Sequence, residues 1–294
     1  MKTGCSVFLV AFVALGASWF GLVRGPLHQL GTEKQTAVLQ SDDAWPPQRT
    51  GDATLGLDVY REYGCAACHT RQIRQTGVAN ELDLVSLGQH QAADFKDFLK
   101  SLMVVPELSS FSNTLCGPDI EKWDGRLPYT LYFGPDDTVV AALAQKLKPL
   151  GIKTDARVVA TGADISHGWG LRQSVAADYL YDQPVELGSL RAGPDLTMTG
   201  ARQPDLNWQL QHLYAPRSVN PRSTMPAFRF LFEVRPISGQ PAPDALSLKG
   251  EFAPPAGMEV VPTPEARHLA AYLLSLKAGA PLYEAPYTPV TAAK

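Results

Sequence analysis

One pentapeptide constrains this chain more than any other feature. Residues 65–69 read Cys-Ala-Ala-Cys-His, a C-x-x-C-H pattern. On one helical turn, positions i, i+3 and i+4 share a face, so two thiols and one imidazole point the same way. This pattern is the attachment signature of a c-type haem, in which both thiols bond to the porphyrin and the imidazole binds iron. We therefore predict one covalently bound haem c (iron), held by Cys65 and Cys68, with His69 as a metal ligand.

Two other uses of paired cysteines are weaker alternatives. Half a zinc site would need a second ligand pair, and Cys116 has no neighbouring cysteine or histidine in the sequence. A redox dithiol would need a β-α-β context, which residues 51–64 do not supply. Cys5 and Cys116 are best interpreted as small, semi-apolar residues.

The composition excludes several classes of protein. The chain has 294 residues, of which 45% are apolar, and a formal charge of −3. An intrinsically disordered chain would be less apolar, and a polytopic membrane protein would have many long apolar runs. A nucleic-acid-binding protein would have a basic excess, so we expect no nucleic-acid partner.

The amino terminus carries a candidate membrane anchor. Ser6 to Val23 form an uncharged run of 18 residues, just long enough to cross a bilayer as a helix. We predict an uncleaved anchor over 1–24 and a polar tether over 25–50; a cleaved signal peptide and a buried helix are the alternatives. Lys2 favours a cytoplasmic amino terminus, which would place the rest of the chain on the periplasmic face of the inner membrane.

A methionine opposite His69 would make the iron six-coordinate. Met225 is the preferred candidate, because Pro226 stiffens its loop, and Met198 is the second candidate. Met103 lies in an apolar run typical of a core. Any of the five other histidines could instead give bis-histidine ligation, although a scattered histidine is more often a surface residue.

Two amphipathic helices frame the prediction of the fold. One precedes the C-x-x-C-H motif and the other follows a Thr263 cap, and they resemble the crossed terminal helices of class I cytochromes c. By position, Gly56 or Tyr60 would approach Tyr272. Between the helices, 129–161 predicts a strand, a helix and a strand. We predict a mainly α fold behind a transmembrane helix: a class I cytochrome c domain over 51–79 and 166–280, an inserted β-α-β (α/β) subdomain over 80–165, and a tail over 281–294.

Four stretches resemble one family, the membrane-anchored mono-haem subunit (subunit II, the O subunit) of cbb3-type cytochrome c oxidases. They are GLDVYREYGCAACHTRQIR (56–74), LYDQPVELGSLRAGPDL (180–196), HLYAPRSVNPRSTMPAF (212–228) and LFE (231–233). With the amino-terminal span, the resemblance covers about half of the chain. Arg71-Gln72 and Gln183 depart from the family pattern, which usually has Gln-Met and histidine there.

The resemblance implies roles for further residues. Pro194 would offer its carbonyl to the imidazole of His69, and Met225 would be the distal iron ligand. Candidates to pair with the haem carboxylates are Arg191, Arg217 and Arg222.

The implied function is a one-electron relay with no catalytic residue of its own. The implied partners are the haem-copper catalytic subunit and a dihaem cytochrome c subunit, with a soluble cytochrome c as another donor. The alternatives are the mono-haem subunit of a nitric oxide reductase or of a dehydrogenase complex, and, from a different class, a haem-based sensor or binding protein.

Overall fold

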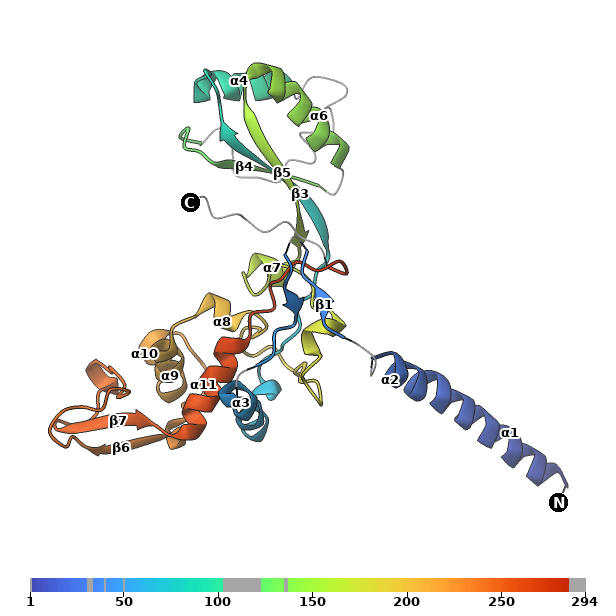
Figure 1. The fold of residues 1–294 in the computed structure, drawn as a ribbon, viewed down its shortest axis with the longest axis vertical. Helices are drawn as coiled ribbons and strands as arrows, with labels where there is room; N and C mark the ends of the chain where they lie inside the picture. Colours follow the sequence, from blue (N-terminus) through green and yellow to red (C-terminus); the bar gives the residue numbers. More distant parts are fainter. Residues whose placement is uncertain are drawn as a thin grey trace.

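The fold comes from a computed structural model that describes residues 2–30, 34–39, 41–49, 51–102, 123–134 and 137–285. Met103 and Cys116 therefore lie outside the described residues. The chain is a mixture, 42% helical and 16% strand, rather than mainly α. Two separate hydrophobic cores divide it into a main lobe (51–76 and 162–285) and a sheet lobe (77–161), which Figure 1 shows one above the other.

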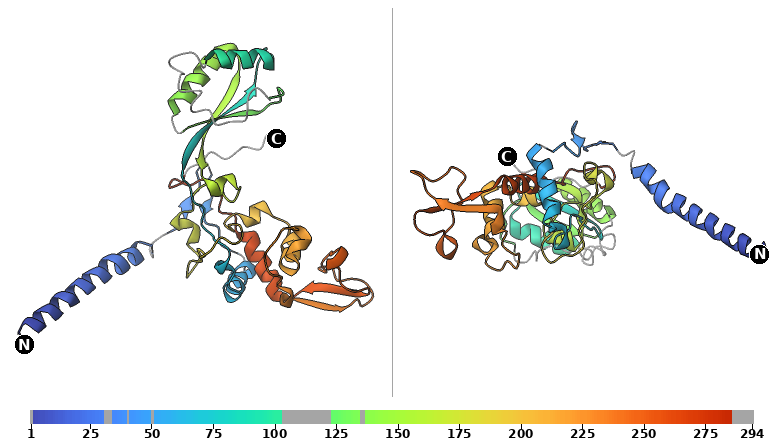
Figure 2. Two further views of the ribbon diagram at one scale, coloured as in Figure 1. Left: turned by 180° about the vertical axis from the view of Figure 1, so that it is seen from behind. Right: turned by 90° about the horizontal axis from the view of Figure 1, so that it is seen from below.

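The amino-terminal helix extends away from both lobes (Figures 1 and 2). It consists of α1 (Lys2–Trp19), a π-helical turn (Phe20–Arg24) and α2 (Gly25–Leu30). Its stretch Gly4–His28 has a mean hydropathy of 2.2, is unburied, and is long and apolar enough to span a membrane. The predicted apolar helix is thus present, and its exposed apolar surface fits lipid better than water.

The main lobe is built on a close crossing of α3 (Gly51–Glu62) and α11 (Pro264–Ser275). A Cβ added to Gly56 would lie 1.9 Å from the backbone oxygen of His268 and 2.7 Å from Cβ of Tyr272. One turn later, the rings of Tyr60 and Tyr272 meet with centroids 5.2 Å apart. The prediction that Gly56 or Tyr60 approaches Tyr272 is confirmed, and both residues do so. The absence of a side chain at Gly56 lets the two backbones touch, and so buries both tyrosines.

The rest of the main lobe consists of short elements joined by ordered loops. Asp205 caps α9 (Leu206–Tyr214), and Thr263 caps α11. Each side chain accepts a hydrogen bond from a backbone N–H of the first turn, as is typical of these residue types before a helix. The further elements are 3-10 turns at Cys65–Ala67, Ala176–Tyr179, Arg229–Leu231 and Gly250–Phe252, helices α7 (Ala163–Ser166), α8 (Thr199–Arg202), α9 (Leu206–Tyr214) and α10 (Pro216–Val219), and the antiparallel pair β6 (Phe232–Pro236) and β7 (Met258–Pro262).

The sheet lobe is a three-stranded antiparallel sheet in the order β4-β3-β5. Its elements are β3 (Gly77–Ser86), α4 (Ala92–Leu102), β4 (Tyr129–Phe133), α6 (Asp137–Leu147), a 3-10 turn (Lys148–Leu150) and β5 (Lys153–Thr161). The predicted strand-helix-strand unit is present, but β3 lies between its two strands. Leu82 and Leu84 face the helices, whereas Glu81 and Asp83 on the opposite face pair with Arg157 of β5.

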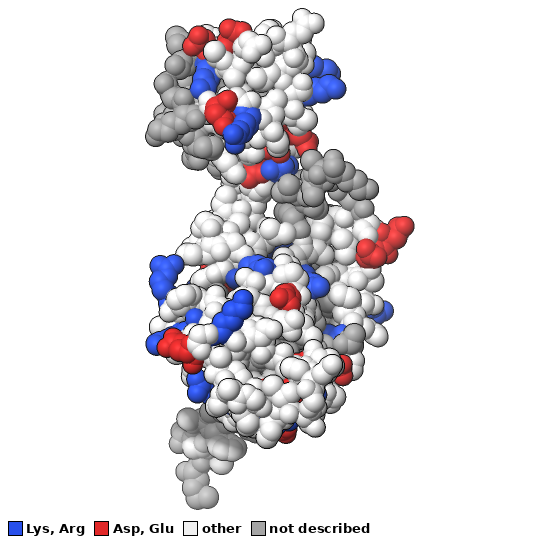
Figure 3. Space-filling model, turned by 90° about the vertical axis from the view of Figure 1, so that its left-hand side faces the viewer, with Lys and Arg blue, Asp and Glu red and all other residues white. Residues whose placement is uncertain are grey.

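The sheet lobe leaves and rejoins the main lobe at one point. The amide of Thr76 donates to the carbonyl of Thr161 (2.8 Å), directly where β3 begins and β5 ends. Figure 3 shows the resulting waist between the lobes, with positive and negative side chains interspersed over the drawn face. Because the two ends of the sheet lobe meet and the lobe has its own core, the core of the main lobe is not interrupted.

The described residues of 34–49, which follow the amino-terminal helix in the sequence, form a strap docked on the main lobe. Two short strands, β1 (Thr36–Ala37) and β2 (Ala44–Trp45), pair with each other. Nε1 of Trp45 donates to Asp178 (2.7 Å), and Arg49 pairs with Asp182, a fully buried carboxylate. The polar sequence predicted a tether, but these two buried acids fix its course.

Replacing Gly56 with alanine should destabilise the main lobe strongly. The new Cβ would overlap the backbone of α11, which cannot move as a side chain can. We expect a loss of at least about 3 kcal/mol in the free energy of unfolding, measured by denaturant titration of the full chain in detergent. Gly51→Ala, on the open side of α3, is the matched control; equal stability of the two variants would contradict the close crossing.

Replacing Trp45 with phenylalanine should loosen the strap. The change removes the hydrogen bond to Asp178 and keeps an aromatic ring, so we expect a loss of about 1 kcal/mol and faster amide hydrogen exchange over 34–49. Asp42→Ala, at an exposed strap position, is the control. Unchanged exchange in Trp45→Phe would show that the strap is held by other contacts.

Candidate functional site

The C-x-x-C-H motif forms a helical turn directly after α3. Gly64 adopts a left-handed conformation (φ 64°) that ends α3 and starts the 3-10 turn. The amides of Cys68 and His69 both donate to the carbonyl of Cys65, at 3.2 and 3.0 Å. The turn therefore places both thiols and the imidazole on one side of the chain, as the spacing predicts.

A second segment, 187–196, runs along this turn and orients His69. Four backbone hydrogen bonds join it to residues 66–71, with donor–acceptor distances of 2.8 to 3.0 Å. The carbonyl oxygen of Pro194 lies 2.8 Å from Nδ1 of His69, so Nδ1 carries the proton and Nε2 is left with its lone pair. Gly193 allows this approach, because a Cβ there would lie 2.2 Å from Cε1 of the ring. The imidazole is thus held in the tautomer and orientation that a metal ligand needs.

Cys65, Cys68 and His69 open onto a cavity of about 460 Å³, which is the size of a cofactor pocket. Its walls come from α3, the 192–196 tract, α8, α9, the 220–226 loop and α11. The α11 wall is apolar, with Leu269 and Leu273, whereas the α8 wall carries Thr199, Arg202 and Gln203. A porphyrin is a flat apolar ring with two carboxylates, so it would need one apolar wall and one polar wall.

The structure separates the two methionine candidates. Met225 lines the cavity together with His69. Met198 instead is 9% exposed and packs at Gly279, where an added Cβ would lie 2.9 Å from the methionine sulfur. Met198 is not among the residues that line the cavity.

The three arginines expected near the haem carboxylates have different positions. Arg222 lines the cavity and is exposed. Arg191 pairs with Asp164, and Arg217 is exposed and donates to the carbonyl of Ser223 (3.3 Å). The structure therefore brings Arg222 to the cavity, but not Arg191 or Arg217.

Three residues that the sequence did not assign to the haem site line the cavity. Each has a buried polar atom with no hydrogen-bond partner. These atoms are the hydroxyl of Tyr60, Nε of Arg202 and Nδ1 of His212. Burial lowers the pKa of His212 to about 4, so its ring is neutral at pH 7. Unsatisfied buried donors are costly. Their presence in one cavity fits a ligand that supplies acceptors, as haem carboxylates do.

A signal for His212 was available in the sequence. It lies in the stretch that resembles the oxidase subunit, on a capped helix, four residues after Trp208 with which its ring stacks (centroids 4.8 Å, 6° between planes). The apolar stripe of α9 suggested a core helix, and spacing alone did not show which of its polar residues face a cavity.

The structure also bears on the two alternative uses of the cysteine pair. Burial raises the pKa of the Cys65 thiol to about 11, whereas a redox dithiol requires a lowered pKa. Within the described part of the chain, Cys, His, Asp and Glu side chains form no group of three or more that could hold a metal ion. A zinc site therefore has no protein-only ligand set there.

A buried charge network lies behind the cavity. Arg71 donates to Asp182 (2.7 Å) and to the hydroxyl of Tyr272 (2.6 Å). Asp182 also holds Arg49 of the strap. Arg71, one of the residues that depart from the family pattern, thus connects the segment of the C-x-x-C-H motif with the strap and α11. Burial raises the pKa of Tyr272 to about 12, so its hydroxyl stays protonated and can hydrogen-bond.

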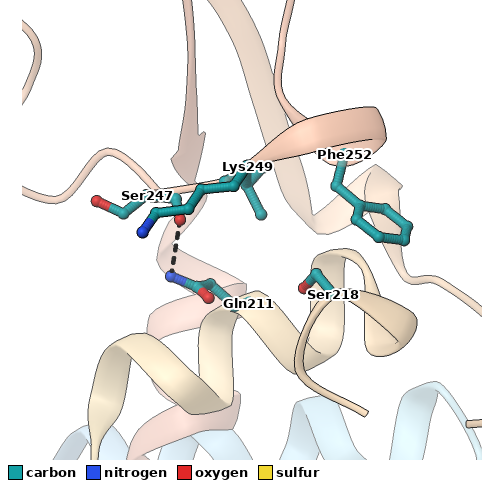
Figure 4. A pocket seen from close by; sticks show the side chains of 6 residues that line it. Gln211, Ser218, Ser247, Lys249 and Phe252 are labelled. Carbon is teal, nitrogen blue, oxygen red and sulfur yellow. Dashed lines mark hydrogen bonds between the residues drawn. The ribbon is translucent and has the colours of Figure 1, made fainter. Parts of the chain in front are cut away.

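A smaller pocket lies between α9, α10 and the 247–252 segment (Figure 4). It has a volume of about 370 Å³, and the amide of Gln211 crosses it to the carbonyl of Ser247 (3.3 Å). Lys249 and Phe252 both belong to the 247–252 segment, which lies across the pocket from Gln211 and Ser218. Its lining includes no cysteine, histidine or methionine, so it lacks the chemistry of the main cavity.

Comparison with known proteins supports the resemblance stated from the sequence. Residues 166–249 match the family described as cytochrome c oxidase, mono-heme subunit/FixO. Over this stretch, the chain is similar to that family. The match includes Pro194, Arg202, His212 and Met225, and the family implies a mono-haem electron-transfer subunit of a cbb3-type oxidase. A search of curated proteins gives no match.

Replacing Gly193 with alanine should displace the His69 ring. The added Cβ would occupy the position of Cε1, so the ring must turn away from the Pro194 carbonyl and lose its hydrogen bond, which costs about 1 kcal/mol. The measurement is the Nδ1–H resonance of His69 in the full chain in detergent micelles, with Gly51→Ala as the control. A resonance that stays unchanged in Gly193→Ala would contradict the close approach.

Proposed function

We propose that the chain is the electron-transfer subunit of a cbb3-type cytochrome c oxidase and carries one covalent haem c in the 460 Å³ cavity. The observation that carries the proposal is the convergence of Cys65, Cys68, His69 and Met225 on that cavity. The FixO match over 166–249 supports it independently, because it covers the Met225 side and not the C-x-x-C-H motif.

Each residue has a defined task in this proposal. Cys65 and Cys68 would hold the group covalently, through thioether bonds from both thiols. His69 would offer Nε2 to the iron, because the carbonyl of Pro194 holds its Nδ1–H. Met225, which lines the same cavity, would offer its sulfur, and methionine–histidine ligation would raise the reduction potential.

When bound, the haem supplies a single iron that exchanges one electron at a time. The apolar side chains of α11 would exclude water from the part of the cavity that they line, and the hydrogen bond to Pro194 would hold the imidazole of His69 in one orientation. The proposed domain is a class I cytochrome c domain formed by the main lobe (51–76 and 162–285), with the sheet lobe (77–161) inserted. These features suit a relay better than a sensor, which needs an open or labile iron position.

The proposed location is the inner membrane, with the haem domain on the periplasmic face. The apolar Gly4–His28 helix supplies the anchor, and Lys2 favours a cytoplasmic amino terminus. Electrons would come from a dihaem cytochrome c subunit or a soluble cytochrome c, and pass to the haem-copper subunit.

Replacing Met225 with alanine tests the axial ligand. We expect covalent haem to remain, because both thiols are intact, while the charge-transfer band of methionine-bound ferric iron disappears and the reduction potential falls. Met198→Ala should keep that band and lose about 2–3 kcal/mol of stability, since it empties a packed site. Loss of low-spin ligation in His212→Gln, with Met225→Ala unchanged, would instead indicate bis-histidine ligation.

Purification of the full chain from its native membranes tests the assignment to an oxidase. A haem-copper subunit and a dihaem cytochrome should copurify in mild detergent, and quantitative haem analysis should give one haem c in this chain. Recovery with a nitric oxide reductase or a dehydrogenase would support one of the alternatives, and recovery without any such partner would contradict the proposal.

A further inference from the structure

Arg202 is a half-buried cation in the cavity wall, and no carboxylate of the described residues pairs with it. It is the last residue of α8, and its side chain lines the cavity. One terminal nitrogen donates to the backbone carbonyl of Asp195, while Nε is buried and has no hydrogen-bond partner. Among the described residues, none offers it a carboxylate within ion-pair distance.

The nearest negative charge does not compensate Arg202. Asp195 attracts it, but the oxygens of Asp195 already accept hydrogen bonds from Thr70, Gln72 and Thr197. Burial outweighs this attraction and lowers the pKa of Arg202. A guanidinium without a partner in a partly buried wall costs free energy that a bound carboxylate would offset.

The other arginines near the cavity lack this combination. Arg191 is already paired with Asp164, and Arg217 is exposed and bound to a backbone carbonyl. Arg222 lines the cavity but is exposed, so water screens its charge. Of these four arginines, Arg202 alone lines the cavity and has a buried nitrogen, Nε, without a hydrogen-bond partner.

The groups around Arg202 form a polar wall. Thr199 and Gln203 of the same segment line the cavity, and the side chain of Gln209 is tied to the carbonyl of Gln203 (2.9 Å). The α11 wall, which adjoins α8, is apolar at Leu269 and Leu273. A porphyrin with carboxylates on one edge would orient its polar edge toward α8.

We propose that Arg202 binds a haem carboxylate, and that it is the positioning residue that orients the haem in this cavity. The inference rests on the proposed function, since it requires a haem. In this proposal Arg202, rather than Arg191 or Arg217, is the partner of a haem carboxylate. A positive charge fixed beside the carboxylate also disfavours the oxidised, more positive form of the haem, so Arg202 should raise the reduction potential.

The test compares Arg202→Gln and Arg202→Lys with two matched controls, Arg217→Gln and Arg222→Gln, in the full chain carrying its haem. The measurements are the carboxylate bending mode of the haem in resonance Raman spectra and the equilibrium reduction potential in detergent. Neither needs the partner subunits. A purely structural role of Arg202, through the carbonyl of Asp195, would change the thermal stability but not the carboxylate mode.

We expect Arg202→Gln to shift the carboxylate mode and to lower the potential. Arg202→Lys keeps the charge but loses the planar donor geometry, so it should shift the mode and change the potential less. Arg217→Gln should change neither, and Arg222→Gln should have a smaller effect than Arg202→Gln. If Arg202→Gln does not accumulate, the mode in Arg202→Lys decides.

Two results would overturn the inference: an unchanged carboxylate mode in both Arg202 variants, or a larger shift in Arg222→Gln than in Arg202→Gln. Haem staining of the unaltered chain under denaturing conditions separates this failure from that of the proposed function. If the unaltered chain carries covalent haem, a negative result concerns Arg202 alone. If it carries none, the proposed function fails first.

Discussion

The contact of α3 with α11 at Gly56 is the constraint on which the main lobe depends. Because no side chain stands between the helices, their backbones touch, and Tyr60 and Tyr272 are buried one turn further on. The same crossing makes two walls of the cavity: α3 contributes Tyr60, and α11 contributes Leu269 and Leu273. The turn at Cys65 begins three residues after α3 ends. The position of the haem motif is therefore set by the helix crossing.

Hydrogen bonds connect this crossing to the rest of the site. Arg71 follows the motif and donates to Tyr272 of α11 and to Asp182, which also binds the strap residue Arg49. The segment of the motif, α11 and the strap thus share one buried network. Removing one partner of such a network leaves a buried charge without compensation. This cost keeps the strap docked on the main lobe.

The sheet lobe is accommodated because it closes on itself. Its outer strands both pair with β3, its helices cover one face, and its ends meet at Thr76 and Thr161. An insertion whose ends lie within a hydrogen bond of each other adds little loop-closure cost to the host domain. Arg157 pairs with both Glu81 and Asp83 on the face opposite the helices.

The sequence by itself determined the local features: the amino-terminal apolar helix, the caps at Asp205 and Thr263, and the turn of the C-x-x-C-H motif. Each depends on residues a few positions apart, so periodicity and spacing are sufficient. It also indicated the approach of Gly56 and Tyr60 to Tyr272, by resemblance to known helix pairs. The central place of β3 was missed, because its pairing partners lie far away in sequence.

Only the tertiary structure decided which polar side chains share the cavity. Arg191 and Arg202 both lie within ten residues of Gly193 and Pro194, yet Arg191 pairs with Asp164 outside the cavity, whereas Arg202 lines the cavity and pairs with no carboxylate of the described residues. Met198 and Met225 are likewise equivalent as isolated residues, and packing at Gly279 separates them. The physical reason is that burial, pairing and orientation are set by contacts between distant segments, which no local pattern records.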